Sequence, residues 1–74
     1  MNQKRRKTII DIKEVIVDSR NKTNDILLEE EMSYDNMPEN LQGSIKGEES
    51  EEAIEILEEI VELLDEAISK FEEM

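Results

Sequence analysis

Residues 50–74 read SEEAIEILEEIVELLDEAISKFEEM, and this stretch decides the fold that the sequence predicts. Apolar residues recur in it at alternating intervals of four and three, the heptad spacing of a helix that packs against other helices. This row consists of Ala53, Leu57, Ile60, Leu64, Ala67, Phe71 and Met74. Flanking apolar residues widen it on both sides, at Ile54, Ile56, Val61, Leu63 and Ile68. The apolar stripe is therefore wide enough to need at least two neighbouring helices.

The opposite face of the same helix is acidic. Residues 48–74 carry twelve acids and one base, Lys70, whereas residues 1–47 carry nine acids and eight bases. The candidate partner-binding carboxylates on this face are Glu51, Glu55, Glu58, Glu59, Glu62, Asp65 and Glu66. Like charges repel one another along a helix, so a face of this kind serves either solubility or the binding of a basic partner. Both interpretations remain open from the sequence.

Length and composition restrict the classes of protein. A chain of 74 residues forms one domain at most and buries only a marginal core. The absence of cysteine and histidine excludes a disulfide framework and a conventional zinc or haem site. We therefore expect an all-α chain without cofactors that gains stability by self-association, as a homodimer or a higher oligomer.

The N-terminal residues 1–7 include a basic cluster, Lys4–Lys7. No signal-peptide core follows it, because Asp11, Lys13 and Glu14 interrupt the apolar residues, and no apolar run approaches the roughly 18 residues of a membrane span. We expect a cytoplasmic protein without membrane contact. The cluster is either a solvated arm or a phosphate contact, but direct nucleic-acid binding is not expected beside so acidic a helix.

Residues 8–34 predict a second helix, which a capping box at Thr8 would begin. Its row of three–four spacing consists of Ile9, Ile12, Ile16, Ser19, Thr23 and Ile26. Ser19 and Thr23 stand where aliphatic residues are expected. They form either a polar layer that sets the helix register or, with Arg20 and Lys22, a pocket for a small anion.

Residues 35–47 predict an elbow between the helices. Pro38 disfavours continuation of the first helix, and Gly43 would stop a single helical turn after it. We expect Ile45 to hold the elbow against the core, together with nearby apolar side chains. The elbow residues of interest are Tyr34, Asn36, Pro38 and Leu41.

The sequence EEEMSYDNMPENLQGS of residues 29–44 resembles a group of small acidic proteins from bacteriophages and prophages. In that group an acidic run and an aromatic residue precede a D-N-x-P-E-x-L-Q-x-S elbow, which a basic residue, a glycine and an acidic helix follow. Lys46 and Gly47 occupy those places here. The close resemblance covers about a third of the chain. It implies a viral origin and a helical hairpin, and it implies no activity.

No catalytic signature is present, so we expect a protein that is not an enzyme. Acid–base catalysis needs a shielded pair of carboxylates with shifted pKa values, whereas the carboxylates of this chain are expected on a solvated helix face. A carboxylate-bridged di-iron site would need histidine, and no calcium loop or glycine-rich phosphate loop occurs. Three functions remain: a phage protein that binds and inhibits a basic host protein, with DNA mimicry as one form; an oligomeric sponge for a small anionic ligand such as a signalling nucleotide; and a structural helical bundle.

The sequence therefore predicts an antiparallel helical hairpin with a helix over 8–34, an elbow over 35–47 and an acidic amphipathic helix over 48–74. Two hairpins would form a four-helix bundle that buries the wide apolar stripe. The residues expected in the oligomer core are Leu57, Ile60, Leu64 and Phe71.

Overall fold

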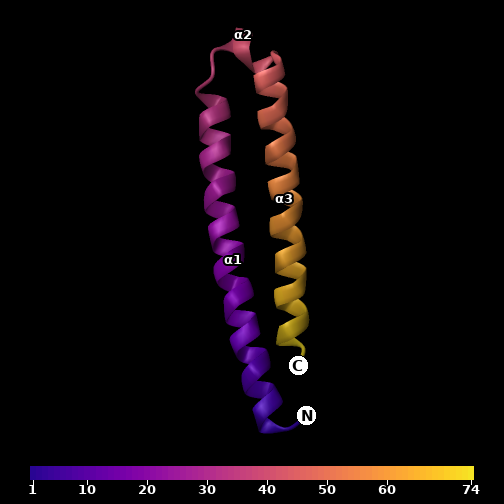
Figure 1. The fold of residues 1–74 in the computed structure, drawn as a ribbon. Helices are drawn as coiled ribbons and strands as arrows, with labels where there is room; N and C mark the ends of the chain where they lie inside the picture. The colour runs from indigo at the N-terminus through magenta and orange to yellow at the C-terminus, as the bar shows by residue number, and fades with distance from the viewer.

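The structure is a computed structural model that describes residues 1–74. Two long helices, α1 (Gln3–Asp35) and α3 (Ile45–Glu72), lie antiparallel and are joined by an elbow that contains the short helix α2 (Glu39–Gln42) (Figure 1). The chain has no strand, and α1 and α3 contact each other over their length. The predicted all-α class and the helical hairpin are confirmed. The hairpin extends 59 × 14 × 14 Å along its principal axes.

The helix α1 begins at Gln3 instead of at Thr8, so the basic residues Lys4–Lys7 belong to the helix and do not form a separate arm. Asn2 is the N-cap, because its side-chain Oδ1 accepts a hydrogen bond of 2.8 Å from the backbone N–H of Arg5. The hydroxyl of Thr8, which we expected to cap the helix, donates to the carbonyl of Lys4 at 3.0 Å. Residues 1–8 are all exposed, and this end of α1 extends past the end of α3 (Figure 1).

The elbow is shorter than the predicted 35–47, because α3 already begins at Ile45. Its N-cap is Ser44, whose Oγ accepts a hydrogen bond of 3.4 Å from the backbone N–H of Gly47. Ile45 does not hold the elbow against the core, since 75% of it is exposed.

The two long helices meet along one row of buried or half-buried residues in each, which we term the inner seam. In α1 it consists of Ile9, Lys13, Ile16, Arg20, Thr23, Leu27, Glu30 and Tyr34. In α3 it consists of Gly47, Ser50, Ile54, Leu57, Val61, Leu64, Ile68 and Phe71. Both rows keep strict heptad spacing, as in an antiparallel coiled coil.

Each seam is rotated from the row that the sequence predicted. In α3, Val61 is buried at 8% exposure, whereas Ile60 is 38% exposed. In α1, Ile12, Ser19 and Ile26 lie outside the seam and are exposed. The apolar stripe of α3 is four positions wide, so spacing alone could not say which two positions would face α1.

The hairpin core is small. Leu27 and Val61 are the only apolar residues that are buried in one chain. A core of this size contributes little stability to a domain. Many apolar residues of both long helices remain exposed in the single hairpin.

Candidate functional site

Three polar contacts cross between the helices on one side of the inner seam. The guanidinium of Arg20 donates to both carboxylate oxygens of Asp65, at 2.9 and 3.4 Å. The ammonium of Lys13 lies 4.0 Å from the carboxylate of Glu72, and the hydroxyl of Tyr34 donates to Glu51. The positions in α1 differ by multiples of seven, and so do the matching positions in α3. These contacts fix the antiparallel register of the hairpin.

A fourth polar contact lies near the elbow, where Ser50 is buried at 5% exposure. Its hydroxyl donates to the carboxylate of Glu30 at 2.6 Å. Glu30 and Ser50 both belong to the inner seam, so α1 and α3 are joined here by a hydrogen bond and not by apolar packing. No buried side-chain polar atom in the chain lacks a partner.

The acidic face, which comprises the seven predicted residues Glu51, Glu55, Glu58, Glu59, Glu62, Asp65 and Glu66, is exposed along α3. Two of its members are engaged within the chain, since Glu51 accepts from Tyr34 and Asp65 pairs with Arg20. The other five carboxylates form no ion pair. Lys13 and Arg20, seven residues apart in α1, pair with Glu72 and Asp65, seven residues apart in α3. The next positions in these two series are Leu27 and Glu58, so Glu58 has no base opposite it.

The surroundings of Tyr34 in the hairpin raise the pKa of its phenol. The hydrogen bond to Glu51 raises the pKa of the Tyr34 phenol above its usual 10.0, because it stabilises the protonated form. Desolvation and the negative charges of Glu51 and Asp35 act in the same direction. The tyrosine therefore serves as a hydrogen-bond donor that holds α1 to the start of α3.

The four residues of the candidate ligand pocket do not converge in one chain. Arg20 is engaged with Asp65, and the ammonium of Lys22 lies 3.0 Å from Asp18 on the outer side of α1. The hydroxyl of Thr23 donates to the carbonyl of Ser19 at 2.8 Å, which satisfies it within its own helix. Ser19 is exposed beside the inner seam.

The expected oligomer-core residues divide between two surfaces. Leu57, Leu64 and Phe71 belong to the inner seam and are half-buried against α1, whereas Ile60 faces away from it. Ile60 belongs to a second row with heptad spacing, which we term the outer seam. It consists of Glu49, Ala53, Ile56, Ile60, Leu63, Ala67 and Lys70. Its apolar members come from two parts of the predicted stripe, because Ala53, Ile60 and Ala67 belong to the main row and Ile56 and Leu63 to its flank.

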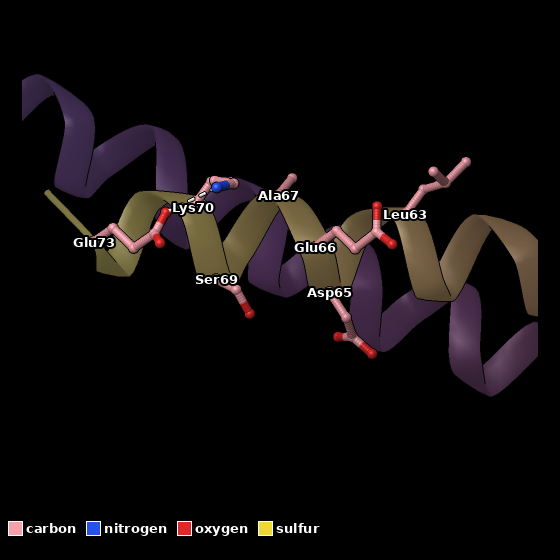
Figure 2. A pocket seen from close by; sticks show the side chains of 7 residues that line it. All are labelled: Leu63, Asp65, Glu66, Ala67, Ser69, Lys70 and Glu73. Atoms are coloured by element: carbon pink, nitrogen blue, oxygen red, sulfur yellow. Dashed lines mark ion pairs between the residues drawn. The ribbon is translucent and has the colours of Figure 1, made fainter.

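Figure 2 shows the division of α3 near its C-terminus. Leu63 and Ala67 point to one side of the helix, and Asp65 and Ser69 point to the other. The shallow depression drawn there is lined by residues of α3 alone. It is an open part of the helix surface, and no second element encloses it. Glu66, a member of the acidic face, lines the same depression as Leu63 and Ala67, so the outer seam and the acidic face are neighbouring surfaces of one helix.

The elbow residues explain how the hairpin turns. The side-chain amide of Gln42 donates to the carbonyls of Tyr34 and Met37, at 3.1 and 3.3 Å, and Asn36 donates its backbone N–H to Met32 at 3.0 Å. These bonds pair carbonyls in the last turn of α1 and just after it. Pro38 caps α2 with its carbonyl, which accepts from Leu41 and Gln42. Leu41 itself is 44% exposed.

The residues quoted for the phage resemblance therefore have structural roles in the turn. Gln42 was not among the elbow residues that we singled out, although its amide makes two of the closing bonds. A glutamine four residues after a helix-breaking proline is the signal that could have identified it.

No helix of the chain is both long enough and apolar enough to cross a membrane. Comparison with models of protein families, with curated proteins and with solved structures finds no match to this chain.

Proposed function

We propose that this chain is a non-enzymatic interaction protein that binds a basic protein partner through its acidic face. The observation that carries the proposal is the set of five carboxylates without an ion pair, Glu55, Glu58, Glu59, Glu62 and Glu66, along one helix. The basic residues of a partner would form ion pairs with these carboxylates, and the negative charge would attract such a partner at long range.

The spacing of the acids supports DNA mimicry as the form of this binding. Residues 51–66 hold eight acids over about 22 Å of helix, which is roughly one charge per 3 Å. One strand of duplex DNA carries one phosphate per about 3.4 Å. A host nucleic-acid-binding protein is therefore the partner class that fits best. With the resemblance of the elbow to phage and prophage proteins, we propose an inhibitor of a host or defence protein in the bacterial cytoplasm.

We also propose that the hairpin self-associates into a four-helix bundle. The exposed apolar residues of the outer seam support this, because soluble chains rarely leave such a row uncovered. Light scattering at micromolar concentration should then give twice the 8.7 kDa of one chain or a higher multiple. A monomeric mass would overturn self-association and leave the binding proposal standing. The alternative function is a purely structural helical bundle. In that case the function of the chain would depend on the outer seam and not on the acidic face.

The ligand-sponge alternative has less support, because Arg20 and Lys22 each already pair with a carboxylate.

The test of acidic-face binding is a pull-down from bacterial lysate with three forms of the tagged chain. The first is the unchanged chain, and the second is E55Q/E59Q/E62Q/E66Q. The third is a control with the same charge change on α1, D11N/E14Q/D25N/E29Q, whose four acids also form no ion pair.

We expect the unchanged chain and the control to capture the same basic protein, which high salt releases and duplex DNA displaces. The α3 variant should lose it. Equal loss from both variants would show that only net charge matters, and equal capture by all three forms would contradict a role for the acidic face.

A further inference from the structure

The outer seam of α3 is uncovered in the hairpin. Ile56 and Leu63 are 49% and 63% exposed, and no element of the chain packs over them. The spacing of the row alternates between four and three, so its residues form a continuous stripe along the helix. A stripe with this spacing is the form of surface that a second helix covers.

The outer seam reads nearly the same in both directions from its centre at Ile60. Ile56 and Leu63 lie on either side of Ile60, and small residues, Ala53 and Ala67, follow at seven residues in each direction. The row ends in an acid, Glu49, on one side and in a base, Lys70, on the other. The sizes are therefore symmetric about Ile60, and the charges are opposite.

We infer that the outer seam binds the outer seam of a second copy of this chain, antiparallel, with a two-fold axis near Ile60. In this arrangement the large residues meet large residues at the centre, and the alanines let the two helices approach closely. Glu49 of each copy then lies within about one turn of Lys70 of the other. The inference rests on the self-association that we propose above and adds its surface, its partner and its orientation.

A parallel pairing of the same seams would be unfavourable. It would place Glu49 beside Glu49 and Lys70 beside Lys70 of the second copy, and like charges that face each other across an interface oppose it. Lys70 is free to change partner, because its side chain is 81% exposed in its contact with Glu73. The antiparallel pairing is also the closed, two-fold arrangement that most homodimers adopt.

The helix α1 adds apolar residues to the same side of the hairpin. Ile26 lies six residues after Arg20 in α1, and Ile60 lies five residues before Asp65 in α3. Because Arg20 and Asp65 are paired and the helices are antiparallel, Ile26 and Ile60 lie at about the same height along the hairpin. Both are exposed, at 54% and 38%. They would lie together at the two-fold axis and would become the central layer of the four-helix bundle.

The orientation can be tested with cysteines, because the chain contains none of its own. Variants E49C, K70C and E49C/K70C would each be treated with a short bis-maleimide and analysed on a denaturing gel. Positions 49 and 70 of one helix are about 31 Å apart, so the reagent cannot join them within a chain. We expect covalent dimers from E49C/K70C and from a mixture of the two single variants, and none from either single variant alone.

The matched control is E48C/S69C, which has the same spacing of 21 residues and is exposed, and Ser69 points to the side of α3 opposite Leu63 and Ala67 (Figure 2). It should give no covalent dimer. Covalent dimers from E49C alone and K70C alone would show a parallel pairing and overturn the inference, while self-association would stand. Dimers from the control but not from E49C/K70C would overturn the surface, and a monomeric mass by light scattering would overturn the inference together with self-association.

Charge exchange gives a second, independent readout. In the antiparallel dimer, E49K places two lysines together at both ends of the interface and should weaken the dimer roughly fivefold. The double exchange E49K/K70E restores two opposite-charge contacts and should restore the affinity. A double variant as weak as the single one would contradict the pairing of Glu49 with Lys70.

Discussion

Gly47 is the residue at which α3 passes closest to the elbow. A Cβ atom at this position would lie 2.0 Å from the carbonyl oxygen of Gln42 and 2.6 Å from that of Leu41, distances that no real Cβ shows. Backbone atoms form the obstacle, so a side-chain rotation cannot relieve it. Gly43, four residues earlier, has open space around it and a negative φ of −84°.

The two glycines therefore predict opposite results. G47A should lower the free energy of unfolding by about 2 kcal/mol, as overpacking does. G43A should leave it unchanged or raise it by up to about 1 kcal/mol, because alanine restricts the unfolded chain. Urea denaturation followed by circular dichroism measures both, and equal effects would contradict the close approach at Gly47.

Tyr34 offers a spectroscopic test of its contact with Glu51. The chain has one tyrosine and no tryptophan, so the ultraviolet absorbance of phenolate reports Tyr34 alone. We expect its pKa above 10.0 in the unchanged chain and closer to 10.0 in E51Q, where the negative charge is removed.

The sign of the linkage follows from the raised pKa of the folded state. The contribution of Tyr34 to stability is fully present below the unfolded pKa of about 10 and is lost as the pH rises through the folded pKa. Unfolding experiments at pH 8 and above pH 10 should show this loss in the unchanged chain, and a smaller one in E51Q.

Between the two long helices, polar contacts take the place of much of the apolar packing. Four of the eight inner-seam positions in α1 hold charged or hydroxyl side chains, namely Lys13, Arg20, Thr23 and Glu30. Lys13 and Arg20 form ion pairs with acids of α3. Contacts between partly exposed charges stabilise only weakly. Their main effect is on register, because a shift of α3 by one turn would separate every pair.

A double-mutant cycle measures the strongest of these contacts. The variants R20A, D65A and R20A/D65A should give a coupling free energy of about 0.5 kcal/mol, the range of partly exposed ion pairs. A second cycle with D18A, K22A and D18A/K22A measures an i, i+4 pair on the outer side of α1 and provides a control within one helix. Coupling near zero for Arg20 with Asp65 would mean that this pair does not hold the helices in register.

At the scale of the whole molecule, neighbouring residues on α3 should separate folding from association. L64D places a charge in the half-buried contact between α1 and α3 and should remove most of the helical circular dichroism, since an unpaired charge there is unfavourable and the core is small. L63D places the same charge in the outer seam and should lower the native mass to one chain while most helicity remains at low temperature. The same outcome for both variants would contradict the assignment of two seams.

The sequence predicted the number of long helices and the position of the turn, because heptad spacing and Pro38 depend on local geometry. It did not predict the direction that each helix faces. In α3, Ile60 and Val61 are both apolar, and their spacing alone does not say that Val61 faces α1 and Ile60 does not. Seven-residue steps from Lys13 to Arg20 and from Asp65 to Glu72 were the available signal for this register.

At the candidate site, too, local patterns could be predicted and contacts between the two helices could not. The acidic face was visible because its charges repeat along one helix, whereas the contact of Ser50 with Glu30 joins residues from different helices and leaves no local pattern. Similarly, the capping box at Thr8 is a common pattern and predicts the start of the first helix at that residue. Asn2 caps the helix earlier and extends it through the basic residues.

The length of the hairpin affects how it moves through solution. Its radius of gyration is 17.1 Å, whereas a globular chain of 74 residues has one of about 11 Å. An elongated molecule diffuses more slowly and enters the pores of a gel less readily than a sphere of the same mass. A single hairpin will therefore elute from a size-exclusion column where a larger globular protein is expected, and the elution volume of a monomer will resemble that of a compact dimer.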